Sequence, residues 1–137
     1  AFGLLELKYV DDAIAKRKAI AQQYRKYLRD VKGITIWDDI PNVRHNYSYF
    51  PIFIDEKEYG ISRDELYEKL KANNIYGRRY FYPLISNFPM YKGLDSAGPE
   101  NLPVANKIAN QVLCLPIYPE LELENVDDIS QLIIYHR

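Results

Sequence analysis

The chain has 137 residues, a formal net charge of −1 and 27% charged residues. This length suits a single domain with one hydrophobic core, and the composition is that of a globular protein. The near-neutral charge argues against a nucleic-acid or membrane-surface binder, so any anion site must be local. The lone Cys114 excludes an internal disulfide framework and fits the reducing cytoplasm, where we expect the protein.

The N-terminal stretch, residues 1–7, is apolar on nearly every side before any capping residue appears. A helix that is apolar all round must be buried all round, which a helix on the outside of a small domain cannot achieve alone. We therefore expect a fragment cut within a helix, whose other partner surface is missing or belongs to a second subunit. A mature protein with a frayed hydrophobic start is the alternative.

Helical spacing of apolar residues predicts a long helix over residues 4–31, ended by Gly33. Strands are expected at residues 34–37 and 46–54, and the second has two apolar faces, so both should be covered. Pro51 cannot donate to a strand ladder, which favours an edge or a bulge for that strand.

Ser62 and Glu65 form a capping box that predicts a helix up to Asn73. The second half should then contain a strand, a long loop, a short helix, a third strand and a last helix, at residues 75–81, 85–101, 104–111, 112–115 and from Asn125 onward. The last helix should bury Val126, Ile129, Leu132 and Ile133. The predicted fold class is α+β: a small, mainly antiparallel sheet backed by helices, with a long N-terminal helix.

No self-contained catalytic constellation appears. His45, His136 and Cys114 show no metal-ligand spacing, and Cys114 lies in an apolar strand, where an inert core thiol is expected. There is no glycine-rich phosphate loop and no nucleophile elbow. Helix starts and turns explain the paired aspartates better than acid–base chemistry does.

The stretch 76–84 combines adjacent arginines, aromatic rings and a proline. An arginine fork matches carboxylate or phosphate, and aromatic rings stack on sugars or bases. Alternation along a strand would place Arg78, Tyr80 and Tyr82 on one face and Arg79 and Phe81 on the other, so only one arginine can face a site. The alternative is that an arginine pairs with the capped helix.

The predicted substrate-binding residues are Arg78, Arg79, Tyr80, Tyr82 and Asn46, the last at the entry to the neighbouring strand. We predict no catalytic, cofactor-binding or metal-binding residue in this chain.

The chain resembles the C-terminal small domain of the DegT/DnrJ/StrS aminotransferases over essentially its whole length. The resemblance rests on the order and spacing of several segments, at residues 1–7, 16–18, 46–51, 62–66, 78–84, 102–105 and 113–119. Many members have a histidine at the position of Tyr80, so the role of that histidine cannot be transferred. The Arg-Arg-Tyr-Phe-Tyr-Pro form at 78–83 looks like the subset that acts on dTDP-4-keto-6-deoxy sugars.

The resemblance implies that residues 1–137 form one C-terminal small domain of a fold-type I transaminase. In the intact enzyme, a missing N-terminal large domain would hold pyridoxal 5'-phosphate, and the protein would act as a homodimer. The implied reaction transfers an amino group, from a donor such as glutamate, to a nucleotide-linked keto sugar such as dTDP-4-keto-6-deoxyglucose. The fragment alone should be inactive and bind no cofactor.

Two other interpretations remain. A stand-alone α+β module could use the arginine-aromatic segment to bind a small molecule, although the apolar N-terminal turn favours a missing partner. An RNA-binding sheet with exposed aromatic residues is disfavoured by the net charge.

Overall fold

The structure is a computed structural model that describes residues 2–80 and 82–135. Phe81 and His136, which the sequence analysis considered, lie outside these residues. The elements in chain order are α1 (Phe2–Glu6), α2 (Val10–Leu28), β1 (Ile34–Ile36), β2 (Phe50–Ile54), α3 (Glu56–Tyr59), α4 (Arg63–Ala72), the 3-10 turns η1 (Ile85–Asn87), η2 (Asp95–Ala97) and η3 (Pro99–Asn101), α5 (Pro103–Gln111), β3 (Val112–Leu115) and α6 (Leu123–Ile134).

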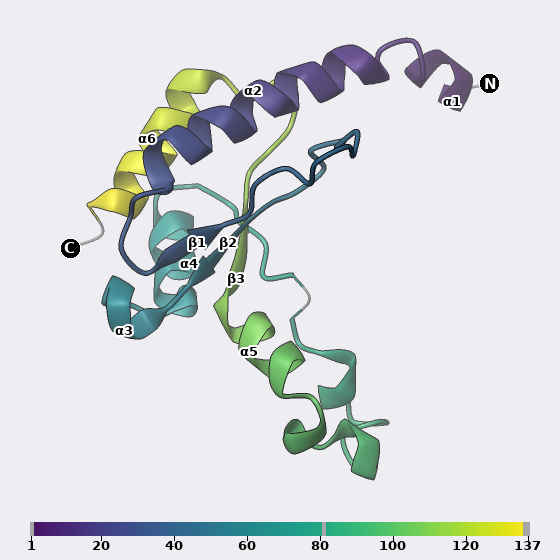
Figure 1. Cartoon of the computed structure of the whole chain (residues 1–137), viewed down its shortest axis with the longest axis vertical. Coiled ribbons are helices and arrows are strands. Elements are labelled where there is room, and N and C mark those ends of the chain that lie inside the picture. The colour runs from purple at the N-terminus through teal and green to yellow at the C-terminus, as the bar shows by residue number, and fades with distance from the viewer. Residues whose placement is uncertain (1, 81, 136–137) are drawn as a thin grey trace.

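The three strands form one antiparallel sheet in the order β1-β2-β3 (Figure 1). Ile34 pairs with Ile54 at one end of the sheet, and Phe50 pairs with Leu115 at the other. The helices α2 and α6 lie side by side and contact each other, while α4 contacts both α6 and β3. The predicted α+β class, a small antiparallel sheet backed by helices, is therefore confirmed.

Both faces of the central strand are covered, as its apolar pattern predicted. Ile52 and Ile54 point into the main core, which is built mostly from α2, α4, α6 and the sheet. Phe53 points the other way and packs with Val112 and Cys114 in a second, smaller cluster, against which Tyr80 and Ile108 lie. Successive residues of a strand face opposite sides, so β2 supplies side chains to both clusters.

Pro51 lies in the central strand and not in an edge strand. It pairs with Cys114 of β3, whereas β1 reaches only as far as Ile52. At Pro51 the strand therefore has no partner on the β1 side. A proline is tolerated there because no strand lies on that side to accept a hydrogen bond from a backbone N–H.

The predicted N-terminal helix is divided into α1 and α2. Asp11 and Asp12 occupy the first turn of α2, where acidic side chains are favoured by the helix dipole. They therefore favour a helix start at Val10 over a continuous helix. The chain turns after Leu28, and Gly33 adopts φ +80°, the left-handed conformation expected of the glycine that follows a helix.

The strand predicted over residues 75–81 is not formed by its described part, residues 75–80. The segment touches the sheet at one residue, where Arg78 pairs with Cys114. Gly77 lies directly before this bridge, and glycine weakens strand pairing because it has no side chain to pack. The main chain turns away at Tyr80 and continues into the 3-10 turns, which lie with α5 away from the rest of the molecule in Figure 1.

The last helix begins earlier than predicted. Its N-cap is Glu122, so Asn125 lies within the helix and does not cap it. Val126, Ile129 and Ile133 are buried as predicted, but Leu132 is 37% exposed. The sequence analysis placed Leu132 in the stripe from spacing alone, and in the structure it lines a surface hollow beside Tyr76 and Tyr118.

Among the described residues, no helix combines the length and apolar character that crossing a membrane would require.

Candidate functional site

The predicted site residue Arg78 lies where segment 75–80 meets the sheet. Its backbone N–H donates to the carbonyl of Cys114 at 2.9 Å, and its carbonyl accepts from the Cys114 N–H at 2.8 Å. The exposed side chain lines a cavity of about 390 Å³, which we call the Arg78 pocket. Its lining residues are Ser48, Tyr49, Tyr76, Arg78, Cys114, Leu115, Pro116, Ile117 and Tyr118.

The Arg78 pocket favours an anionic ligand with a ring. No carboxylate lines the pocket, and within the described part of the chain the Arg78 guanidinium forms no ion pair. The walls carry the rings of Tyr49, Tyr76 and Tyr118. A guanidinium can bind phosphate or carboxylate oxygens through two parallel hydrogen bonds, and exposed tyrosine rings offer faces for stacking.

Tyr80 contacts the pocket through Tyr49. The two hydroxyl oxygens lie 2.7 Å apart, and the ring centroids are 4.7 Å apart. This hydrogen bond is the main cause that raises the pKa of Tyr49 above its ordinary value. Tyr49 therefore contacts Tyr80 and lines the same pocket as Arg78.

Asn46 lies at an adjoining cavity of about 500 Å³ that shares Tyr49 with the Arg78 pocket. Its side-chain oxygen accepts from the Ser48 N–H at 3.1 Å, and its carbonyl accepts from Arg17 Nε at 3.1 Å. Two hydrogen bonds thus fix the conformation of Asn46, and its amide nitrogen remains the group it can offer to a ligand.

The loop that carries Asn46 is held by a buried tyrosine. The Tyr47 hydroxyl donates to Asp39 Oδ2 at 2.5 Å, and Arg25 Nη2 donates to Asp39 Oδ1 at 2.8 Å. The Tyr47 hydrogen bond is the main cause that lowers the pKa of Asp39, and Arg25 adds to it. These contacts tie the loop to α2.

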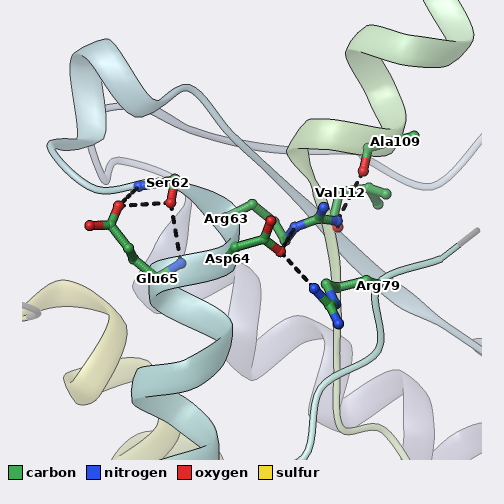
Figure 2. Close-up of polar contacts among 7 residues, drawn as sticks. All are labelled: Ser62, Arg63, Asp64, Glu65, Arg79, Ala109 and Val112. Carbon is green, nitrogen blue, oxygen red and sulfur yellow. Dashed lines mark hydrogen bonds and ion pairs between the residues drawn. The ribbon is translucent and has the colours of Figure 1, made fainter. Parts of the chain in front are cut away.

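Neither Arg79 nor Tyr82 lines the Arg78 pocket. Arg79 lies next to α4 (Figure 2). Arg79 Nη1 donates to Asp64 Oδ1 at 3.0 Å, and the guanidinium carbon lies 4.8 Å from the centre of the Tyr82 ring. The alternation that predicted Tyr82 beside Arg78 ends early, because the chain leaves the sheet after the single bridge at Arg78.

The other candidates for chemistry are occupied or inert. The Cys114 thiol is buried, and burial raises its pKa to about 11, so it is not a nucleophile at neutral pH. His45 Nδ1 accepts from the Tyr47 N–H at 2.8 Å. Among the described residues, no group of histidine, cysteine and acidic side chains could hold a metal ion.

Tyr49, Tyr76 and Tyr118 line the pocket but were not among the predicted substrate-binding residues, although Tyr76 opens the stretch 76–84 that was predicted to face a ligand. The available signal was the high tyrosine content, 13 residues in all. Which of these tyrosines converge depends on the pairing of β2 with β3, and no local pattern contains that information.

The fold and pocket define a small α+β domain that presents an arginine among tyrosine rings. A family model, the DegT/DnrJ/EryC1/StrS aminotransferase family, matches residues 1–133. The chain therefore belongs to the DegT/DnrJ/EryC1/StrS aminotransferase family, as the resemblance implied, and members of this family depend on pyridoxal phosphate.

Two curated relatives carry the same name. A dTDP-4-amino-4,6-dideoxy-D-glucose transaminase of Escherichia coli is 54% identical over 134 residues, which cover 98% of this chain and 36% of the relative. Its namesake in Shigella dysenteriae is 39% identical over 97% of this chain and 35% of the relative. The chain thus spans about a third of the length of these relatives.

Solved structures show the same fold. DesI, determined in the presence of its TDP-sugar product, is 27% identical with a TM-score of 0.88, over 98% of this chain and 35% of DesI. Helicobacter pylori PseC, an aminotransferase involved in pseudaminic acid biosynthesis, is 23% identical with a TM-score of 0.83, over 96% of this chain and 34% of PseC.

The described residues do not fit pyridoxal phosphate. The cofactor forms a Schiff base with a lysine held inside its site, and a lowered lysine pKa requires burial or a cationic neighbour. Every lysine of the described residues is exposed, and none lines the Arg78 pocket. We therefore derive no chemical step through the cofactor from this chain.

Proposed function

We propose that this chain is the C-terminal small domain of a pyridoxal phosphate-dependent aminotransferase. The intact protein, meaning the full-length protein that contains this chain, would transfer an amino group from glutamate to C4 of dTDP-4-keto-6-deoxyglucose. It would act as a homodimer, and a larger N-terminal domain would hold the cofactor. Pyridoxal phosphate, when bound, supplies the electron sink of the reaction.

The choice of substrate rests on the 54% identical relative. That protein is named for an amino group on C4 of a dTDP-linked 4,6-dideoxy sugar. The matching ketone is dTDP-4-keto-6-deoxyglucose, because exchanging the amino group for a carbonyl leaves the rest of the sugar unchanged. The match covers 98% of this chain, including the whole segment that forms the Arg78 pocket.

In this proposal the chain binds and orients the substrate. The Arg78 guanidinium binds the diphosphate, which carries the strongest anionic charge of a nucleotide sugar. The rings of Tyr49 and Tyr76 flank it and offer faces for the base or the sugar. Tyr80 fixes the position of Tyr49, and Asn46 offers an amide to the part of the substrate that reaches the adjoining cavity.

The single observation that carries this role is the Arg78 pocket itself. An arginine without an ion-pair partner among the described residues lines a cavity with three tyrosine rings and no carboxylate. Its neighbour Arg79, by contrast, has a counter-ion in Asp64. A nucleotide diphosphate supplies both the missing charge and a ring.

The test is transamination by the intact protein. It is incubated with pyridoxal phosphate, glutamate and dTDP-4-keto-6-deoxyglucose, and the products are identified by mass spectrometry and NMR. We expect a dTDP-linked 4-amino sugar. Amination of another nucleotide sugar, but not of this one, would overturn the substrate assignment, and no amination of any would overturn the proposed function.

A second experiment concerns the 137-residue chain alone. Since it has no buried lysine among its described residues, we expect it to show no cofactor absorbance after dialysis. A band that survives dialysis and disappears on borohydride reduction would contradict this expectation. It would support a stand-alone cofactor-binding module.

A further inference from the structure

The Tyr82 ring contacts two arginine side chains. Its ring centre is 5.0 Å from the guanidinium carbon of Arg63 and 4.8 Å from that of Arg79. The same two arginines share a carboxylate oxygen: Arg63 Nε and Arg79 Nη1 donate to Asp64 Oδ1 at 2.8 and 3.0 Å (Figure 2). The guanidinium carbon of Arg79 also lies 4.6 Å from the centre of the Tyr67 ring. We call these five residues the Asp64 cluster.

The Asp64 cluster is anchored to the core through Arg63. Its side chain is buried, and Nη1 donates to the carbonyls of Ala109 and Val112 at 2.9 and 3.0 Å. These carbonyls lie where α5 ends and β3 begins. A capping box at Ser62 fixes the start of α4, so Arg63 and Asp64 project from a rigid first turn.

The chain around Arg78, Arg79 and Tyr82 is therefore held at two places. At Arg78, two backbone hydrogen bonds join it to Cys114 of β3. At Arg79 and Tyr82, the Asp64 cluster joins it to α4. Since residues 78–80 make a single bridge to the sheet and no continuous strand, side-chain contacts must supply the remaining support.

We propose that Arg79 and Tyr82 are positioning residues for the Arg78 pocket, and not substrate contacts. The Asp64 cluster holds the segment so that Arg78 points into the pocket and Tyr80 meets Tyr49. This inference rests on the proposed function, in which the pocket binds a dTDP-linked substrate. The Arg79 guanidinium is already paired with the Asp64 carboxylate and contacts the rings of Tyr67 and Tyr82.

Asp64→Asn in the intact protein distinguishes a positioning role of Arg79 from direct binding of the diphosphate, because the two roles predict opposite changes in the Kd for dTDP. If Arg79 only positions the segment, loss of the Asp64 charge loosens the cluster, and the Kd for dTDP rises roughly threefold to tenfold. If Arg79 binds the diphosphate directly, the same change removes a competing anion and the Kd falls. A lower or unchanged Kd, measured by titration calorimetry, would overturn the proposal.

A double-mutant cycle between Arg79→Ala and Tyr82→Leu gives a second test. Residues that act through one contact show non-additive effects, so the double variant should bind dTDP about as weakly as the weaker single variant. Tyr82→Phe keeps the ring that contacts both arginines and should bind like the wild type. Multiplicative effects of the two single changes would contradict the proposal.

Steady-state kinetics of Asp64→Asn distinguish a disturbance of the Arg78 pocket from a general loss of enzyme structure. In Asp64→Asn, we expect the KM for the sugar nucleotide to rise while the KM for glutamate stays unchanged, because only the Arg78 pocket is disturbed. A loss of kcat with equal changes in both KM values would overturn a positioning role. Asp64 is more than half exposed, so this variant should fold.

Failure of the proposed function would be recognised separately, since the wild-type protein would then bind no dTDP. In that case the coupling between Arg79 and Tyr82 is measured in the free energy of unfolding. Coupling there would leave the cluster as a purely structural unit and overturn its positioning role. If Arg79 and Tyr82 showed no coupling, the claim that they act as one unit would be wrong as well.

Discussion

The hydroxyl oxygens of Tyr49 and Tyr80 lie 2.7 Å apart, although the two residues are 31 positions apart in the chain. Their rings also meet, with centroids 4.7 Å apart at an angle of 48°. Tyr49 precedes β2 and lines both the Arg78 pocket and the adjoining cavity. The contact therefore connects the loop of Asn46 with the segment of Arg78, and it makes the two cavities parts of one surface.

Replacing Tyr80 should change the titration of Tyr49. The hydrogen bond between the Tyr49 and Tyr80 hydroxyls is the largest cause that raises the pKa of Tyr49. In Tyr80→Phe, we expect this pKa to fall toward its ordinary value, as followed by NMR titration of the Tyr49 ring carbon bonded to oxygen. Tyr76→Phe is the matched control, since it alters another tyrosine of the pocket and should leave the pKa of Tyr49 unchanged. An unchanged pKa in Tyr80→Phe would show that the hydroxyl contact does not exist in solution.

Arg63→Ala should be among the most destabilising single changes in the chain. It leaves two carbonyls, those of Ala109 and Val112, without their charged donor in a buried place. Hydrogen bonds to a charged group contribute about 1.5–3 kcal/mol each, so we expect a loss of at least about 2 kcal/mol in the free energy of unfolding by urea.

Lys69→Ala, at an exposed position of the same helix, is the control for the Arg63 experiment and should change stability little. If Arg63→Ala lowered the free energy of unfolding by less than about 0.5 kcal/mol, water would be replacing the guanidinium at no cost. That result would contradict the buried position of the Arg63 side chain.

Asp39 should contribute stability that depends on pH. The Tyr47 hydroxyl and Arg25 lower its folded-state pKa. A carboxyl with a depressed pKa stabilises the protein above its unfolded-state pKa, and this contribution is lost as the pH falls through the folded-state value. We therefore expect the stability difference between wild type and Asp39→Asn to be largest near neutral pH and to shrink below about pH 4. A difference that stays constant from pH 7 to acid unfolding would contradict this assignment.

The elements that could be predicted from sequence are those with local signals. The capping box of Ser62 and Glu65 marked the start of α4, and both of its hydrogen bonds are present. The short strand at Val112–Leu115 followed from a run of apolar residues before a proline. Such signals depend on neighbours a few residues away, so they survive without knowledge of the fold.

The arrangement of the site residues depends on contacts that no local pattern contains. The capping box predicted a helix start at Arg63, but not that this arginine would be buried and bond to Val112, 49 positions away. Adjacent arginines indicated a site at residues 78–79, and alternation indicated that they would differ. Their different partners could not be foreseen, because Asp64 approaches Arg79 only once α4 packs on the sheet.

The most direct test of the account is the affinity of the intact protein for dTDP in wild type, Arg78→Lys and Arg78→Ala. If Arg78 binds the diphosphate, Arg78→Ala should raise the Kd at least about tenfold, which corresponds to about 1.4 kcal/mol. Arg78→Lys should lie between the two, because an ammonium keeps the charge but loses the fork. A Kd for Arg78→Ala equal to that of the wild type would contradict the claim that this pocket binds the nucleotide part of the substrate.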